Sequence, residues 1–175
     1  MLPLVGCSSL SGTEGKGYIS ADGQITVYAA ADRSDPVKVE GTSLDDEPVS
    51  ITGMRGTPVV VNLWWSACGP CRAEMPQLVA MESLLRARGV KFIAISADEP
   101  EQESAAAKFL AEVKIPAPGY IRRAKDDDKF INAIDPKWSG ALPALFLYDK
   151  TGRKVKMFVG ETPMKEVEAA IMKLL

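Results

Sequence analysis

Histidine is absent from this chain of 175 residues, and cysteine occurs only three times. The absence of histidine excludes serine–histidine and cysteine–histidine nucleophile pairs, an imidazole general base, and most kinds of zinc and haem ligation. Three cysteines are too few for the disulfide framework of a small secreted domain. Any chemistry must therefore come from thiols, carboxylates or the backbone.

Two further absences limit what the protein binds. There is no surplus of basic residues, since 21 lysines and arginines stand against 23 aspartates and glutamates, for a formal charge of −2. A nucleic-acid-binding face needs clustered basic charge. Nor does the sequence contain an apolar run of about 18 residues, which a membrane-spanning helix requires. With 46% apolar and 25% charged residues, the chain has the composition of a single globular domain.

The first residues differ in composition from the rest. A short apolar stretch leads to Cys7, and residues 8–17 are rich in serine and glycine, as in a flexible tether. A small residue before a cysteine, followed by such a tether, is similar to the cleavage and lipidation site of a bacterial lipoprotein signal. We therefore expect a lipoprotein-like N-terminus and tether over residues 1–22, with lipidation at Cys7, and a folded domain over residues 23–175. The alternative is a tail with one free thiol.

The centre of the chain has the pattern of a βαβ unit. Val59–Trp64 is an almost continuous β-branched and apolar run, and Phe92–Ser96 is a second such run, so both are predicted to be buried strands. Between them, an amphipathic stretch from Pro70 to about Arg88 predicts a helix that ends at Gly89. Such a unit makes the two strands parallel with a right-handed crossover.

Shorter patterns complete an α/β fold. The alternating runs within residues 23–52 predict a small antiparallel β lead-in. Ala144–Tyr148, the turn after it and Lys154–Val159 predict an antiparallel hairpin, which makes the central sheet mixed. Further helices are predicted at residues 101–113, 129–134 and 164–174, flanking the sheet.

Cys68 and Cys71 enclose Gly69 and Pro70 at the junction between the buried strand and the long helix. A helix N-terminus presents unpaired backbone N–H groups and the positive end of the helix dipole, both of which favour a thiolate. Pro70 suits the first turn because it has no N–H to leave unpaired. Two intervening residues bring the sulfurs within disulfide reach. We predict a redox pair in which Cys68 is the nucleophile and Cys71 resolves the mixed disulfide.

Two alternatives for this pair are weaker. A zinc site needs further ligands, and the chain offers one more cysteine and no histidine. A structural disulfide across two residues closes too small a loop to constrain the unfolded chain. No metal and no other cofactor is expected.

The segment NLWWSACGPCRAEMP, residues 62–76, resembles the active-site segment of the TlpA/ResA-like thioredoxin-fold proteins, which are extracytoplasmic thiol-disulfide oxidoreductases related to the AhpC/TSA and Redoxin proteins. The resemblance extends to Gly53–Gly56 and to Leu142-Pro143, and covers roughly residues 36–175. It implies a thioredoxin-like fold with a central mixed sheet flanked by helices, an N-terminal β-hairpin extension and a central insertion.

The resemblance also implies roles for single residues. Pro143 matches the cis-proline beside the CxxC segment, and the backbone of Leu142 would pair with a substrate as an added strand. Glu74 matches an active-site acid that moves protons to and from the thiols. Asn62 stands where cytoplasmic thioredoxins carry a buried aspartate, so Glu74 would supply the missing carboxylate. Gly69, Pro70 and Asn62 would support the site.

One departure from the family concerns the residue before Cys68. The family usually has an aromatic residue there, whereas this chain has Ala67, with Trp65 upstream. Ala67 would leave Cys68 less covered on one side. We expect Trp65 and Trp138 to contribute to substrate binding.

The leading interpretation is therefore an extracytoplasmic protein-disulfide reductase, acting in cytochrome c maturation or in redox homeostasis of the cell envelope. The Gly-Pro dipeptide between the cysteines is that of reducing thioredoxins, which favours reduction. Its partners would be a disulfide-containing protein substrate and a membrane thiol reductant similar to CcdA or DsbD. The main alternative is a cytoplasmic thioredoxin-like reductase.

Two other functions lack necessary residues. A peroxiredoxin-type peroxidase needs threonine or serine three residues before its cysteine, where this chain has Trp65, and a proline further back, where it has Val61. A copper metallochaperone on the same scaffold needs a histidine beside its cysteines.

Overall fold

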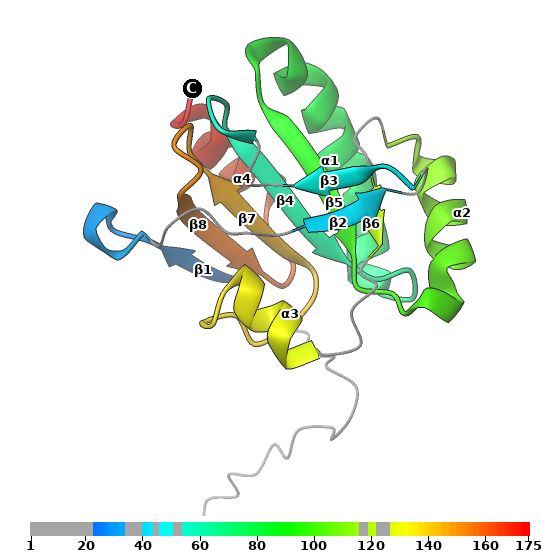
Figure 1. Ribbon diagram of the computed structural model, residues 1–175. Helices are drawn as coiled ribbons and strands as arrows, with labels where there is room; N and C mark the ends of the chain where they lie inside the picture. Colours follow the sequence, from blue (N-terminus) through cyan, green and yellow to red (C-terminus); the bar gives the residue numbers. More distant parts are fainter. Residues whose placement is uncertain (1–22, 34–39, 44–45, 51–53, 116–118, 122–126) are drawn as a thin grey trace, which may run out of the picture.

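The computed structural model describes residues 23–33, 40–43, 46–50, 54–115, 119–121 and 127–175. They form an eight-stranded mixed sheet, in the order β1-β8-β7-β4-β5-β6-β2-β3, with helices on both faces (Figure 1). The strands are β1 (Gln24–Val27), β2 (Glu40–Ser43), β3 (Pro48–Ser50), β4 (Val59–Trp64), β5 (Lys91–Ser96), β6 (Gly119–Ile121), β7 (Ala144–Tyr148) and β8 (Lys154–Val159). The α-helices are α1 (Gly69–Leu85), α2 (Glu103–Val113), α3 (Asp127–Ile134) and α4 (Met164–Met172), and short 3-10 turns are η1 (Ala30–Asp32), η3 (Arg86–Arg88) and η4 (Pro100–Gln102).

The centre of the sheet is the parallel pair that the βαβ pattern predicts. β4 and β5 run parallel over their full length, with Val59 opposite Lys91 and Trp64 opposite Ser96. Every residue of β4 is buried, because packed side chains cover both faces of the sheet at this position. α1 starts a short turn after β4 and is followed by η3, which ends at Gly89 with a left-handed φ of 83°.

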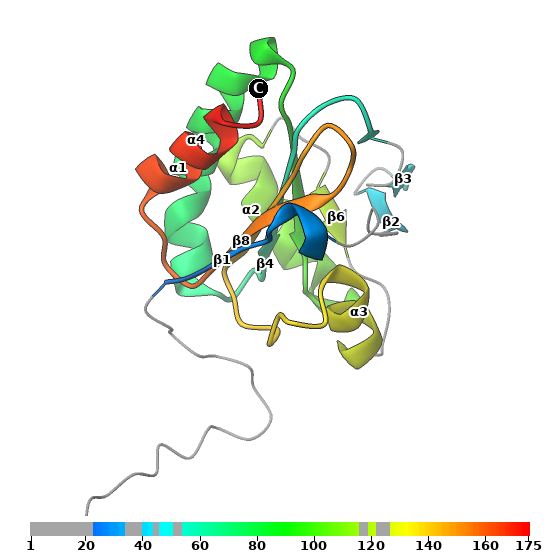
Figure 2. The same ribbon diagram turned by 90° about the vertical axis from the view of Figure 1, so that its left-hand side faces the viewer.

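Side chains alternate along the strands between two cores, one on each face. The first core joins α1, α2 and α4 to sheet residues such as Val60 and Trp64. The second joins Ile134 of α3 to the alternate residues Val61 and Leu63. Figure 2 shows α1 and α4 on one side of the sheet and α3 on the other. The strand period of two thus divides the apolar residues between two helical layers.

The lead-in strands pair antiparallel, as predicted, but they occupy opposite edges of the sheet and do not form a single lead-in together. β2 and β3 form the expected antiparallel hairpin, with Gly41 opposite Val49, and β2 joins the sheet beside β6. β1 instead pairs antiparallel with β8, with Ile25 opposite Phe158. Alternation identifies a strand but not its partner, because any free sheet edge offers the same backbone hydrogen bonds.

A buried polar cluster holds β1 at its edge. Tyr28, directly after β1, donates a hydrogen bond to Asp135 after α3. Lys154 of β8 donates to the Asp135 carboxylate at 2.6 Å and to the Ile134 carbonyl at 2.6 Å. Burial opposes ionisation of Asp135, but hydrogen bonds from Lys154 and Tyr28 outweigh it and hold the pKa of this carboxyl below its ordinary value. The cluster therefore ties β1, α3 and β8 together.

Some expectations fall outside the described residues. These are the tether of residues 1–22 with its lipidation site at Cys7, and Gly53 of the family-like segment ahead of β4. Among the residues that the structure does describe, no helix has the length and apolar character needed to cross a membrane.

Candidate active site

Cys68 and Cys71 lie at the junction between β4 and α1, where they form a disulfide with their Cα atoms 5.3 Å apart. Cys68 is the N-cap residue of α1, Pro70 stands at the helix start, and Cys71 lies in the first turn. The backbone N–H of Cys71 donates to Cys68 Sγ at 3.2 Å. The first sulfur therefore faces an amide group at the open end of the helix, where a thiolate is favoured once the disulfide is reduced.

Both cysteines are completely buried, each with an exposed fraction of 0%. Ala67 and Gly69, on either side of Cys68, are exposed, but Cys68 itself belongs to the first core together with Trp64. This corrects the expectation that Ala67 leaves Cys68 less covered. Cys68 is covered by the core residues that pack against it, although the side chain that precedes it is small.

Glu74 lies one turn beyond Cys71 on the same side of α1 and has an exposed fraction of 7%. The side-chain amide of Asn62 on β4 donates to Glu74 Oε1 at 3.1 Å. Burial raises the pKa of Glu74 to about 8; the hydrogen bond from Asn62 lowers it, and the charge of Glu161 raises it. At neutral pH most Glu74 side chains therefore hold a proton.

The loop before β7 brings Pro143 to the same edge of the sheet. The peptide bond between Leu142 and Pro143 is cis, as the family resemblance implies. β7 then begins at Ala144, which pairs with Leu63 near the end of β4, so Pro143 and the CxxC segment lie beyond the same strand ends. The Pro143 carbonyl accepts a hydrogen bond from the N–H of Gly160 at 2.8 Å. Leu142 is half-buried and packs against both cores.

The two tryptophans expected to bind substrate lie in different surroundings. Trp65 is half-buried beside the CxxC segment, and its indole N–H donates to the side chain of Gln102 at 3.3 Å. Trp138 is only 4% exposed, lies in the second core, and donates its indole N–H to the Ala141 carbonyl at 2.9 Å. This corrects the expectation for Trp138: it packs the loop ahead of Pro143 and offers no surface to a groove.

Glu161 is a residue of this site that sequence reasoning missed. It is exposed, follows β8, and its charge contributes to the raised pKa of Glu74 after the larger effect of burial. β8 pairs antiparallel with β7, and Val159 lies opposite Ala144, so the residues after β8 reach the edge that carries the CxxC segment. No motif marks this position, because only the strand pairing brings it there.

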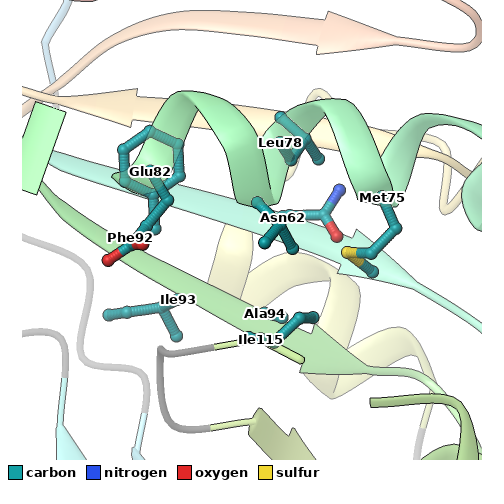
Figure 3. Close-up of a pocket in the computed structure, with 9 residues that line it drawn as sticks. Asn62, Met75, Leu78, Glu82, Phe92, Ile93, Ala94 and Ile115 are labelled. Carbon is teal, nitrogen blue, oxygen red and sulfur yellow. The ribbon is translucent and has the colours of Figure 1, made fainter. Parts of the chain in front are cut away.

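A small cavity lies between α1 and the strands β4 and β5 (Figure 3). Its volume is about 30 Å³, and its walls include Asn62, Met75, Leu78, Phe92 and Ile115. This is room for one or two water molecules, whereas a small-molecule site typically measures about 300 Å³ or more. The cavity is therefore too small to hold a small-molecule ligand. In the described part of the chain, no group of three or more acidic or cysteine side chains is arranged to hold a metal.

The Redoxin family model matches residues 29–171 of this chain. The thiol-disulfide oxidoreductase ResA of Bacillus cereus is 30% identical over 133 residues, which cover 76% of this chain and 72% of that protein. ResA of Halalkalibacterium halodurans is 30% identical over 125 residues, which cover 71% of this chain and 66% of that protein.

Solved structures resemble the fold. A secreted thiol-disulfide isomerase from Corynebacterium glutamicum has a TM-score of 0.75 at 22% identity, covering 91% of this chain and 97% of that chain. A thioredoxin family protein from Chlorobium tepidum has a TM-score of 0.70 at 22% identity, covering 83% of this chain and 99% of that chain. At these identities the solved structures establish the fold, which is thioredoxin-like.

Proposed function

We propose that this chain, a member of the Redoxin family and a ResA-like thiol-disulfide oxidoreductase, reduces disulfides of protein substrates outside the cytoplasm. The observation that carries the proposal is the Cys68–Cys71 pair at the start of α1, with the Cys71 N–H directed at Cys68 Sγ. The extracytoplasmic location is supported by a structural neighbour whose name describes a secreted thiol-disulfide isomerase.

In the proposed reaction the reduced protein starts as a dithiol. The Cys68 thiolate attacks one sulfur of the substrate disulfide; a bond forms from Cys68 Sγ to that sulfur, and the other substrate sulfur leaves as a thiolate and takes up a proton. Cys71 then attacks Cys68 Sγ and releases the second substrate sulfur. The substrate gains two electrons and two protons, and the protein is left with the Cys68–Cys71 disulfide found in the structure.

In its ionised form, which is the minor form at neutral pH, Glu74 would accept the Cys71 proton for the resolving step. Cys71 must lose its proton before it attacks, and it is buried one helical turn from Glu74. Because burial raises the pKa of Glu74 to about 8, its proton affinity lies close to that of a cysteine thiol, which is the condition for efficient exchange. Asn62 orients the carboxyl through its hydrogen bond to Oε1.

The substrate would bind across the exposed edge around Gly69. Leu142 and Pro143 lie beyond the same strand ends as the cysteines, and the backbone ahead of β7 would add the substrate as a strand. Trp65, half-buried beside the cysteines, would supply an apolar contact. Gly69 has no side chain to obstruct a partner, and a Cβ built there meets nothing within 4 Å.

The remaining parts of the proposal concern direction, location and partners. The Gly-Pro dipeptide between the cysteines favours reduction. We place the domain at the outer face of the membrane, anchored through a lipidated Cys7 and the tether of residues 1–22. There it would receive electrons from a membrane thiol reductant similar to CcdA or DsbD. Its role would be in cytochrome c maturation or in redox homeostasis of the envelope.

Substitution of each cysteine tests the proposed function. Cys68→Ser should abolish reduction of insulin disulfides, while Cys71→Ser should accumulate a mixed disulfide with substrate in the native envelope, from which the partner can be identified by mass spectrometry. Cys7→Ser is the matched control, because it removes a thiol outside the redox pair: it should keep the reductase activity and lose a diacylglyceryl group and membrane attachment. Insulin reduction that survives in Cys68→Ser would refute the assigned nucleophile.

A further inference from the structure

Asp98 is a fully buried carboxylate just beyond the carboxyl end of β5, with an exposed fraction of 0%. It accepts a hydrogen bond from the backbone N–H of Ser66 at 2.9 Å and a second from the Ser66 hydroxyl at 2.5 Å. The Ser96 hydroxyl donates to the same carboxylate. Ser66 follows β4, so Asp98 joins the ends of the two parallel strands at the edge that carries the cysteines.

The segment held by Asp98 leads directly into Cys68. The N–H of Cys68 donates to the carbonyl of Trp65 at 2.9 Å, which closes a turn with Ser66 at its second position. Before the turn, the N–H of Ala97 donates to the carbonyl of Trp64 at 2.8 Å and extends the β4–β5 pairing toward Asp98. Both the side chain and the backbone of Ser66, two residues ahead of the first cysteine, are therefore anchored to Asp98 just beyond β5.

We propose that Asp98 is a positioning residue for Cys68, acting through Ser66; this deepens the proposed function and rests on it. The N-cap backbone of Cys68 is extended, with φ −79° and ψ 104°, and its sulfur accepts the Cys71 N–H at 3.2 Å. A shift of the turn moves the sulfur off the helix N-terminus. The thiolate then loses that stabilisation, the pKa of the Cys68 thiol rises, and the disulfide becomes harder to reduce.

A direct effect of the Asp98 charge would have the opposite sign. A nearby negative charge disfavours a thiolate, so removing it would lower the pKa of the Cys68 thiol and make the disulfide easier to reduce. The direction in which the pKa of the Cys68 thiol moves therefore separates a positioning role of Asp98 from a direct effect of its charge. The two effects also differ in which variant shows them, because asparagine removes the charge while keeping the shape of Asp98.

The test uses three variants of the full chain. Asp98→Ala removes the anchor. Asp98→Asn keeps an acceptor for the Ser66 N–H, and its amide can donate to the Ser66 hydroxyl, which is free to rotate. Ser66→Ala removes one anchoring hydrogen bond and leaves the Asp98 charge. The matched control is Asp149→Ala, which removes another aspartate that accepts backbone N–H groups, from Thr151 and Arg153, at the opposite end of the sheet.

Two quantities are measured: the pH midpoint of Cys68 alkylation by iodoacetamide, and the equilibrium of the disulfide with glutathione. Asp98→Ala should raise the alkylation midpoint by about one pH unit and shift the equilibrium about tenfold toward the disulfide, which corresponds to about 30 mV. Ser66→Ala should raise the alkylation midpoint by about half a pH unit and shift the glutathione equilibrium about threefold toward the disulfide. Asp98→Asn and Asp149→Ala should each stay within about 0.3 pH units and about twofold of the wild-type values.

Each remaining outcome decides the matter. Wild-type values for Asp98→Ala, or an easier reduction in Asp98→Asn, would overturn the positioning role while leaving the proposed function intact. If Asp98→Ala does not fold, Ser66→Ala carries the test, and unchanged values there overturn the inference. A wild-type protein whose cysteine pair does not equilibrate with glutathione would overturn the proposed function itself.

Discussion

Glu74→Gln is the substitution whose effect follows most directly from the structure. Glutamine keeps the size of the buried side chain and an oxygen that can accept the hydrogen bond from Asn62, but it does not titrate. Burial raises the pKa of Glu74 from the ordinary value of 4.5 to about 8. The folded protein therefore keeps a proton that the unfolded chain releases, and this stabilisation is fully present below about pH 4.5 and is lost as the pH rises through about 8.

The size of the effect follows from the shift. One pKa unit corresponds to about 1.36 kcal/mol, so the complete loss amounts to about 5 kcal/mol. Between about pH 5 and about pH 9 the wild-type protein should lose about 4 kcal/mol of unfolding free energy through this group. That is a large part of the roughly 5–15 kcal/mol that stabilises a typical domain. Glu74→Gln should not show this loss.

The assay is urea denaturation of the oxidised protein, in which Cys68 and Cys71 are bonded and do not titrate. A companion variant, Asn62→Leu, has nearly the same side-chain size and removes the hydrogen bond that lowers the pKa of Glu74, so its loss of stability should extend to higher pH. Parallel pH profiles for the wild-type protein and Glu74→Gln would refute a buried Glu74 that is protonated at neutral pH. In the reductase assay, the same substitution should change the pH dependence of the rate.

Three further outcomes are expected. Glu161→Gln should lower the pKa of Glu74, because burial would then act without the added negative charge. The pH-dependent loss of unfolding free energy in the urea assay should therefore move to lower pH, and a pH profile that does not move would contradict this. Lys154→Met should lower the unfolding free energy at neutral pH by about 3 kcal/mol, because it leaves Asp135 buried without its cation; an unchanged urea midpoint would show that the pair is dispensable. Gly140→Ala should lower the midpoint temperature of thermal unfolding, because alanine is strained at a φ of 84° and its Cβ would lie 2.8 Å from a side chain of α3. A midpoint at or above that of the wild type would argue against this strain.

The elements nearest the site could be predicted from the sequence because their signals are local. Val59–Trp64, which is apolar except for Asn62, and Ala144–Tyr148, which is apolar throughout, both form strands with the predicted bounds. α1 begins where a proline and a cysteine pair follow a strand, as the pattern indicates. In each case the determinant is a feature of consecutive residues, which a folded neighbour does not alter.

Pairing and burial were beyond the reach of the same reasoning. β1 has the same alternation as the other lead-in strands, yet it lies at the opposite edge of the sheet, beside β8. Trp138 stands close to Pro143 in the sequence, yet its ring is enclosed by the second core. Where a side chain ends relative to the surface depends on residues that are distant in the chain, and no local pattern contains them.

What the sequence determined by itself is the chemistry available: a chain without histidine, with two cysteines across Gly-Pro at the start of a helix, has a thiol pair as its reactive group. The tertiary structure decided how that pair is tuned. It buried Glu74 against Asn62, brought Glu161 within electrostatic reach, and attached Ser66 to Asp98 just beyond the neighbouring strand. The physical reason is that a residue's type and spacing are properties of the chain, whereas desolvation and the field at a given atom arise only from the groups that folding brings around it.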